Sequence, residues 1–206
     1  MDTSIFQAEY NEEGKKMVIF ENNAKMIANR FKKTQEEIDE YAKEIFEQLK
    51  SNYDNDATFY RNGETKIAVK LLFRKITTIR KIEDIEDFLD KYKSHYKFII
   101  VSKITPKAYK QFLEYDNLEV FFDDDLLVNK IDHIFVPKHI PLSKDEQDQI
   151  RKEYGFKRIE IGIIKQSDPI ARYYNLKPGE IISIERTSKN SGIAVYYRHC
   201  MPSPLM

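Results

Sequence analysis

The spacing of apolar residues alternates between the helical and the strand period through the first ~130 residues, and this alternation most limits how the chain can fold. Apolar residues recur three and four positions apart in segments 24–31, 38–49 and 82–92, as in helices with one buried face. Ile67, Val69, Leu71 and Phe73 occupy alternate positions, which predicts a half-buried strand, and the apolar run 98–101 predicts a strand covered on both faces. Alternating helices and strands are typical of an α/β unit in which helices cover a sheet.

Short motifs predict where several of these elements begin. Thr34 and Glu37 have the spacing of a capping box, in which the hydroxyl and the carboxylate each accept a hydrogen bond from the other residue's backbone N–H. Asn62-Gly63 lies between two strand-like segments and predicts a hairpin turn of type I′, with both residues at positive φ. Thr105-Pro106 predicts a further helix, since Pro at the first helical position loses no hydrogen bond.

The first unit is expected to end with a strand at 118–122 and a helix from Asp123 to Ile131. Carboxylates stabilise a helix N-terminus, which suits the run Asp123-Asp124-Asp125. A divalent-ion site is the alternative for this run, but adjacent residues on a helix point in different directions.

A second series of elements starts at His133 and predicts a smaller α+β unit. Residues 133–139 are expected to be extended, and Ser143 with Glu146 forms a capping box for a helix to Tyr154, which Gly155 ends. The remaining expected elements are a helix capped by Asp168 with Pro169 at its first position, a left-handed residue at Asn175, a turn at 177–179, strands at 180–186 and 193–198, and an unstructured tail after Met201. The chain is therefore predicted to contain two domains, residues 1–132 and 133–206.

The charge of the chain is balanced overall but not along its length. Lys+Arg and Asp+Glu both number 34, which argues against a protein that coats nucleic acid through a general basic excess. Residues 133–206 carry a net charge of +4 and the preceding residues −4, so the two units are expected to have different surroundings. Cys200 is the single cysteine, and the sequence shows neither a secretory pattern nor a membrane-spanning apolar run, which predicts an intracellular protein without disulfides.

Several motifs in fixed order resemble the fifth subunit of eukaryotic nuclear RNA polymerases. Over about 70 residues the match runs almost without gaps, and the archaeal counterpart of that subunit consists of little more than this region. The motifs are His133-x-x-Val136-Pro137-Lys138-His139-x-x-Leu142-Ser143, Asp168-Pro169-x-Ala171-Arg172-Tyr173, Lys177-x-Gly179-Glu180, Arg186-x-Ser188 and Tyr197-Arg198. Upstream, Thr34-Gln35-Glu36-Glu37, Phe98–Val101, Ile104-Thr105-Pro106 and the run 118–128 resemble the additional N-terminal domain of the eukaryotic subunit, while residues 53–96 match only in pattern.

This resemblance implies a non-catalytic subunit of a multisubunit DNA-directed RNA polymerase, without cofactor or metal. In the family, a C-terminal α+β assembly domain docks on the largest subunit, and an N-terminal α/β jaw domain with a nuclease-like fold lies beside downstream duplex DNA. The implied partners are therefore other polymerase subunits and DNA, not a membrane or a second copy of the chain. Departures from the family pattern suggest the version encoded by large cytoplasmic DNA viruses, which implies the host cytoplasm and virion, whereas a cellular version implies the nucleus.

The candidate interface residues are those of the C-terminal motifs. Aromatic and Arg side chains are typical anchors of stable interfaces, because they bury a large area and make several hydrogen bonds. Ile181, Ile184 and Val195 belong either to this surface or to the core of the small domain. The candidates are His133, Val136, Pro137, Lys138, His139, Asp168, Pro169, Arg172, Arg186, Tyr197 and Arg198.

The candidate DNA contacts are Lys103, Thr105, Pro106, Lys107 and Lys110. A helix N-terminus offers free amides to a phosphate, and lysines add a salt-sensitive attraction that does not depend on base sequence. The alternative is an ordinary capped helix with solvated lysines.

An enzyme is the competing interpretation. Glu64-x-Lys66, with Asp54 or Asp56 upstream, has the residue types of a restriction-type nuclease site, in which carboxylates hold Mg²⁺ and Lys activates water. Such a site would make the chain a free-standing DNA-binding or nuclease-like factor with the same fold. His133 and His139 lack partners for a zinc site, and the sequence contains no phosphate loop or nucleophile motif.

Overall fold

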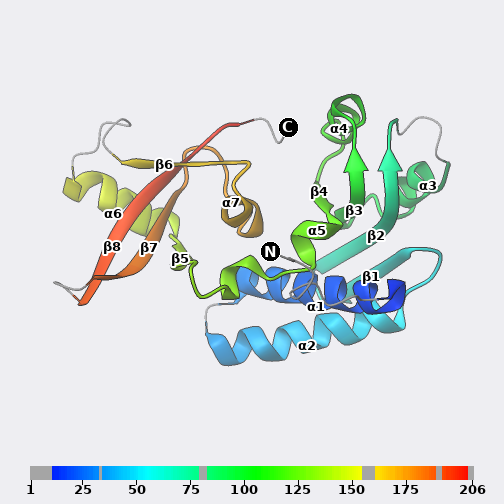
Figure 1. Ribbon diagram of the computed structural model, residues 1–206, viewed down its shortest axis with the longest axis horizontal. Helices are drawn as coiled ribbons and strands as arrows, with labels where there is room; N and C mark the ends of the chain where they lie inside the picture. The colour runs from blue at the N-terminus through cyan, green and yellow to red at the C-terminus, as the bar shows by residue number, and fades with distance from the viewer. Residues whose placement is uncertain (1–10, 33, 79–82, 155–160, 189–191, 204–206) are drawn as a thin grey trace, which may run out of the picture. The chain divides into compact units, whose positions relative to one another are not determined.

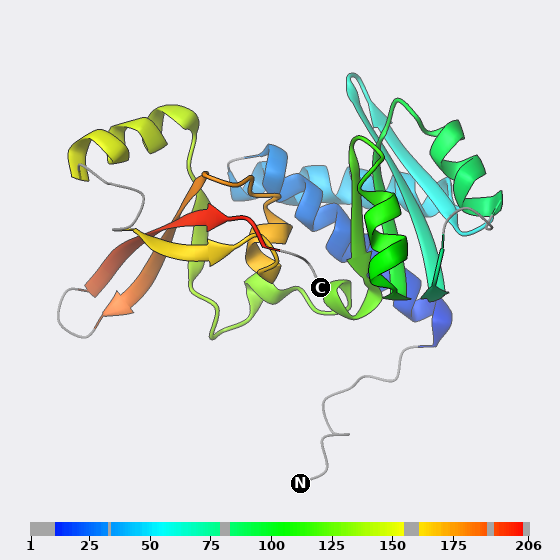
Figure 2. The ribbon, with the colours of Figure 1, turned by 90° about the horizontal axis from the view of Figure 1, so that it is seen from above.

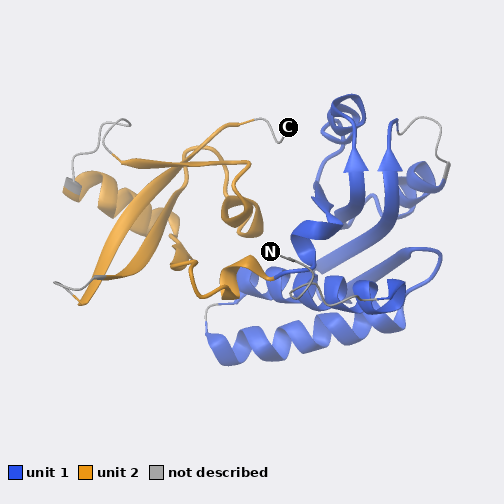
Figure 3. Ribbon diagram, in the orientation of Figure 1, with its two compact units in different colours: residues 1–128 blue, residues 129–206 orange. Residues whose placement is uncertain are grey.

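The chain forms two compact units, which comprise residues 1–128 and 129–206 and are called unit 1 and unit 2 (Figure 3). The structure is a computed structural model that describes residues 11–32, 34–78, 83–154, 161–188 and 192–203. The division falls between Val128 and Asn129, whereas the sequence motifs place the boundary between residues 132 and 133.

Unit 1 is built around a four-stranded sheet of strand order β1-β2-β3-β4 (Figure 1). The first pair is antiparallel and the other two pairs are parallel. Its elements are α1 (Glu12–Phe31), α2 (Gln35–Ser51), β1 (Ala57–Asn62), β2 (Thr65–Ile76), α3 (Glu83–Lys91), β3 (Tyr96–Ile104), α4 (Pro106–Phe112), β4 (Leu118–Phe122) and α5 (Asp123–Leu126).

Helices cover both faces of this sheet (Figure 2). On one face, Phe88 of α3 and Phe112 of α4 join a cluster with Ile99 and Val101 of β3. On the other face, Phe98 of β3 lies under the guanidinium of Arg30 of α1, 5.7 Å from the ring centre. Because neighbouring strand residues point to opposite faces, the continuous apolar run of β3 is buried on both sides, as its sequence predicts.

The strand β2 is more deeply buried than predicted. Its alternating residues suggested a half-buried strand, but every residue from Ile67 to Leu72 is buried, because β2 lies inside the sheet with helices on both faces. Lys70 lies within this buried run, and its ammonium donates to the Asp84 carboxylate at 2.6 Å and to the Asn55 carbonyl at 2.8 Å. The charged side chain is thereby satisfied inside the unit.

The predicted hairpin is present, but its turn type was wrong. Asn62 pairs with Thr65 as the last residue of β1, so the central turn residues are Gly63 and Glu64. Gly63 has φ +55 and Glu64 does not have positive φ. A Gly with positive φ at the first central position is the pattern of a type II′ turn, not type I′.

The helix boundaries in unit 1 confirm the caps and correct two lengths. The Thr34–Glu37 capping box and the Thr105 cap with Pro106 at the first position are both confirmed. The first helix begins at Glu12 instead of residue 24, because the Asn11 side chain accepts from the Gly14 N–H at 2.7 Å and caps it there. The helix expected to reach Ile131 ends at Leu126, and a separate turn of 3-10 helix follows in unit 2.

Unit 2 contains a second four-stranded sheet, of order β5-β7-β8-β6. The β5–β7 and β7–β8 pairs are antiparallel, and β6 is parallel to β8. Its elements are the 3-10 helix η2 (Lys130–Asp132), β5 (Lys138–Pro141), α6 (Lys144–Tyr154), β6 (Gly162–Lys165), α7 (Pro169–Tyr173), β7 (Ile181–Ser188) and β8 (Gly192–Met201).

Caps and turns of unit 2 largely follow the sequence. Ser143 and Glu146 form the predicted capping box, with the Ser143 N–H 2.7 Å from the Glu146 carboxylate. Asn175 has φ +51 as predicted. The predicted turn at 177–179 is a β-turn closed by the Glu180 N–H on the Lys177 carbonyl, with Gly179 at φ +90 as in type II. Gly155, the predicted helix end, lies outside the described residues.

In unit 2 one prediction was wrong and one strand was missed. Residues 133–136 are not extended but form a turn, closed by the Val136 N–H on the His133 carbonyl at 2.8 Å, and the strand starts only at Lys138. The strand β6 was not predicted, because four residues are too few for a clear period. In the tail, Ser203 lies in no helix or strand, as predicted, and it forms hydrogen bonds with the backbone N–H and the hydroxyl of Ser167.

Candidate subunit interface

One face of the unit 2 sheet gathers four polar and aromatic side chains from three strands. Ile182, Ile184 and Arg186 are alternate residues of β7 and therefore point to the same face of the sheet. Tyr196 and His139 pair with Ile184, and Arg198 pairs with Ile182. This face therefore carries Arg186 of β7, Tyr196 and Arg198 of β8, and His139 of β5. The Arg186 guanidinium lies 5.5 Å from the centre of the Tyr196 ring. We call this set, His139, Arg186, Tyr196 and Arg198, the arginine face.

The electrostatics of His139 reflect this grouping. Burial of the imidazole lowers the His139 pKa, and the positive charges of Arg198 and Arg186 lower it further. The carbonyl of Pro137, 2.6 Å from Nδ1, and the carboxylate of Asp168 act in the opposite direction. The arginine face therefore favours a neutral imidazole and carries its positive charge on the two guanidinium groups.

The helix α7 covers the centre of the same sheet face. Ile170 and Ala171 pack against Ile182 and Cys200 in the core of unit 2. The Asp168 carboxylate accepts from the Ile170 N–H at 2.9 Å and caps the helix, as predicted. Three candidates, Asp168, Pro169 and Arg172, thus lie on or beside α7, with Pro169 exposed and the other two half-buried.

The remaining candidates on the strands separate between core and surface. Ile181 and Ile184 are buried core residues, whereas Val195 is exposed. Tyr197 pairs with Ser183 and lies on the opposite face from Arg198, so these two neighbours cannot act on one surface. Sequence reasoning missed Tyr196, although strict alternation along β8 places it with Arg198.

The segment before β5 combines anchored and exposed residues. Val136 packs on the core of unit 2, and Pro137 is half-buried. Lys138 is paired with Glu185 at 3.6 Å, and His133 is exposed with its ring 5.5 Å from that of Phe135. Sequence reasoning did not single out Ile134 and Phe135, which are 89% and 86% exposed in unit 2. Two adjacent large apolar side chains with this exposure are candidates for a contact surface.

In unit 1, Lys103, Lys107 and Lys110 are all exposed around the start of α4. We call them the jaw lysines, after the jaw domain that the family resemblance implies for this unit. The helix start itself offers little to a phosphate, because Pro106 has no N–H and the Ala108 N–H donates to the Thr105 hydroxyl. The Thr105 hydroxyl in turn donates to the Thr77 carbonyl at 3.0 Å. Any anion here would therefore be held mainly by the lysine side chains.

The nuclease interpretation is wrong on geometric grounds. Asp54 and Asp56 precede β1, while Glu64 and Lys66 follow it. The six residues of β1 span about 20 Å at roughly 3.3 Å per residue, so the two pairs lie at opposite ends of the strand. Carboxylates this far apart cannot share a metal ion.

Neither a metal centre nor a membrane-spanning helix is found in the described part of the chain. Within the described ranges, no three His, Cys, Asp or Glu side chains gather as metal ligands would. The Asp123 carboxylate, the proposed alternative ion ligand, accepts from the Ser102 hydroxyl and from the Asp124 N–H. None of the described helices combines the length and the apolar character of a bilayer-spanning segment.

Comparisons with known proteins identify the family. The family model described as RNA polymerase Rpb5, C-terminal domain, matches residues 128–200, which is nearly all of unit 2. The chain is 32% identical over 153 residues to DNA-directed RNA polymerase subunit 5 of Acanthamoeba polyphaga mimivirus, which covers 74% of each chain. It is 34% identical over 131 residues to DNA-directed RNA polymerases I, II, and III subunit rpabc1 of Dictyostelium discoideum, which covers 61% of this chain and 66% of that protein. One relative is thus viral and one cellular, and the chain belongs to the family of the fifth subunit of DNA-directed RNA polymerases.

Proposed function

We propose that this chain is a non-catalytic structural subunit in which unit 2 docks on the largest polymerase subunit and unit 1 forms part of the jaw beside downstream duplex DNA. The observation that carries the proposal is the coincidence of the family's C-terminal domain, residues 128–200, with the unit that bears the arginine face. A cellular version of this subunit would act in the nucleus, and a viral version in the host cytoplasm and virion.

Unit 2 has the physical character of a docking module. Its surface offers two guanidinium groups and Tyr196 on one sheet face, and the exposed pair Ile134-Phe135 at its N-terminal end. Arg and aromatic side chains dominate the binding energy of stable interfaces, since each buries a large area at a modest entropic cost. The jaw lysines would contribute a charge-based contact to DNA without reading bases, as an enzyme that moves along every sequence requires.

A tagged copy of the chain, isolated from its native cells, tests the docking role. The proposal expects the two largest polymerase subunits to accompany it in stoichiometric amounts through washes at high salt. Isolation of the chain without them would overturn the proposal and leave the free-standing factor as the alternative.

Charge reversal of the jaw lysines tests the DNA role. In the assembled polymerase, the triple Lys→Glu variant is expected to retain all subunits but to hold downstream DNA less tightly. The slope of log affinity against log salt should fall by about 1 for each phosphate that is no longer neutralised by a lysine.

The matched control reverses the charge of three other exposed lysines, which lie on α1 and α2 over the other face of the sheet. They are Lys15, Lys43 and Lys50. This control variant should bind DNA as the wild type does. If the jaw-lysine variant fails to assemble and still retains DNA, the roles proposed for the two units are reversed.

A further inference from the structure

A hollow of about 540 Å³ lies in unit 2 between α6, the turn at 177–180 and the strand β8. His199 lines this hollow and pairs with Ile181, whereas Arg198 of the arginine face pairs with Ile182. Because neighbouring residues of a strand point to opposite faces, the hollow lies on the sheet face opposite the arginine face. Its lining combines aliphatic, cationic and anionic side chains: Lys144, Gln147, Asp148, Arg151, Ile161, Pro178, Gly179, Glu180, Ile181 and His199. We call it the α6 hollow.

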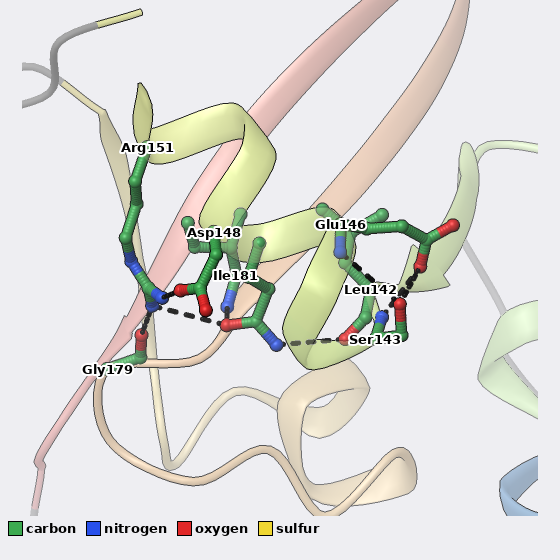
Figure 4. Close-up of polar contacts among 8 residues, drawn as sticks. Leu142, Ser143, Glu146, Asp148, Arg151, Gly179 and Ile181 are labelled. Carbon is green, nitrogen blue, oxygen red and sulfur yellow. Dashed lines mark hydrogen bonds and ion pairs between the residues drawn. The ribbon is translucent and has the colours of Figure 1, made fainter. Parts of the chain in front are cut away.

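One wall of the α6 hollow is fixed by a hydrogen-bond network (Figure 4). The Gln147 amide donates to the Leu142 carbonyl at 2.8 Å, and its oxygen accepts from the Ile181 N–H at 3.1 Å. The Arg151 guanidinium donates to the Gly179 carbonyl and to the Asp148 carboxylate, each at 2.9 Å. These contacts tie α6 to the start of β7, so the wall is formed before any ligand arrives.

Most charged groups of the lining are already engaged within unit 2. Asp148 is paired with Arg151, and the Glu180 carboxylate accepts from the Lys177 N–H at 2.7 Å. Lys144 is different, because its ammonium has no hydrogen bond or ion pair within the described part of the chain. It is therefore the uncommitted cation of this lining.

His199 supplies the second uncommitted group. The residue is 7% exposed, and its Nδ1 is buried without a hydrogen-bond partner among the residues that the structure describes. A buried polar atom without a partner costs free energy, and a ligand that supplies the partner recovers it. An imidazole Nδ1 that carries the proton donates to an acceptor, and carboxylate oxygens are strong acceptors.

We propose that the α6 hollow receives an acidic side chain, Asp or Glu, from a partner polymerase subunit, with its carboxylate between Lys144 and His199. This inference rests on the proposed docking function and adds a specific contact to it. Ile161, Pro178 and Ile181 provide apolar surface for the methylene groups of such a side chain.

A nucleic-acid phosphate fits the α6 hollow less well than a carboxylate does. Phosphate backbones are held by several cations together, whereas Arg151 is already paired and Lys144 alone remains. Asp148 and Glu180 also line the hollow, and their repulsion acts on one charge of a carboxylate but on every successive charge of a strand.

Direct binding is tested on the full chain with small probes and NMR of the imidazole nitrogens. Titration with glutarate should shift the His199 resonances in a saturable manner, whereas neutral glutaramide should leave them unchanged. Lys144→Gln should weaken glutarate binding about threefold or more, the size of an exposed ion pair. The proposal is overturned if glutarate gives no saturable shift, if glutaramide acts equally, or if inorganic phosphate binds more tightly than glutarate.

Assembly in the native cells gives an independent readout. The large subunits should leave a tagged Lys144→Glu chain at lower salt than they leave the wild type. Lys152→Glu is the matched control, since Lys152 is an exposed lysine of the same helix that does not line the α6 hollow, and it should behave as the wild type.

The two proposals fail in different ways. If the wild-type chain brings no large subunits, the docking function itself is wrong. If the wild type and Lys144→Glu release them at the same salt concentration, the docking function stands and the α6 hollow has no part in it.

Discussion

The pair Arg30–Glu119 allows a quantitative prediction for unit 1. Arg30 of α1 donates to both carboxylate oxygens of Glu119 of β4, at 2.7 and 3.1 Å, and Tyr96 donates to the same carboxylate at 2.5 Å. The two charged side chains are only 10% and 17% exposed. Replacing Arg30 with Met keeps the aliphatic volume but leaves the Glu119 carboxylate without its cation.

The expected loss follows from this burial. Removal of one partner from a buried, hydrogen-bonded ion pair costs about 3–5 kcal/mol, because the remaining charge is desolvated without compensation. Since both side chains keep some contact with solvent, we expect about 3 kcal/mol for Arg30→Met. For a unit of this size, that corresponds to a fall in melting temperature of roughly 10 °C.

Urea unfolding followed by far-UV circular dichroism measures the change, since the chain contains no Trp for fluorescence. Lys25→Met is the matched control on the same helix, because the Lys25–Glu21 pair is exposed at 39% and 55% and should contribute less than about 1 kcal/mol. The double variant Arg30→Met/Glu119→Leu should recover much of the loss, as the unpaired charge is gone. A loss for Arg30→Met no larger than that for Lys25→Met would refute the reasoning.

Three further predictions concern unit 2. Because burial and the charges of Arg198 and Arg186 lower the His139 pKa, its contribution to stability is present above the ordinary pKa of about 6.5 and is lost as pH falls towards the folded-state pKa. His139→Gln should therefore flatten the dependence of the urea midpoint on pH below about 6.5, and an unchanged dependence would contradict this. Burial, together with the Glu180 charge, raises the pKa of the Cys200 thiol. A thiol reagent should therefore label Cys200 only at the rate at which the protein unfolds. Rapid labelling in native buffer would show that the thiol is accessible in the folded protein. Gly179→Ala should destabilise unit 2 by about 1 kcal/mol, because Gly179 has φ +90, which Ala rarely adopts. An added Cβ would meet no atom within 4 Å, so the cost is conformational and not steric. The shift in urea midpoint measures this cost, and a stabilised variant would exclude the turn as described.

Sequence reasoning was most successful where a few neighbouring residues decide the structure. The capping boxes at Thr34 and Ser143, the proline helix starts at 106 and 169, and the left-handed Asn175 all depend on contacts within about four residues. The family was also identifiable from motifs in fixed order, which is a property of the chain and not of its packing.

Errors occurred where the outcome depends on residues far away in sequence. The strand β2 is buried on both faces because β1 and β3 flank it and helices cover the sheet, which its own alternation cannot reveal. Lys70 is another case, since its burial depends on a carboxylate of α3 and a carbonyl of the loop before β1.

The functional surfaces show the same division. The amino-acid sequence by itself determined the helices, their caps, the two-part organisation of the motifs and the family. Only the tertiary structure decided which side chains share a surface: strand pairing places Tyr196 with Arg186, turns Tyr197 away from Arg198, and separates the acids on either side of β1. The physical reason is that local signals act through backbone hydrogen bonds over a few residues, whereas a surface requires the register between strands that are remote in the chain.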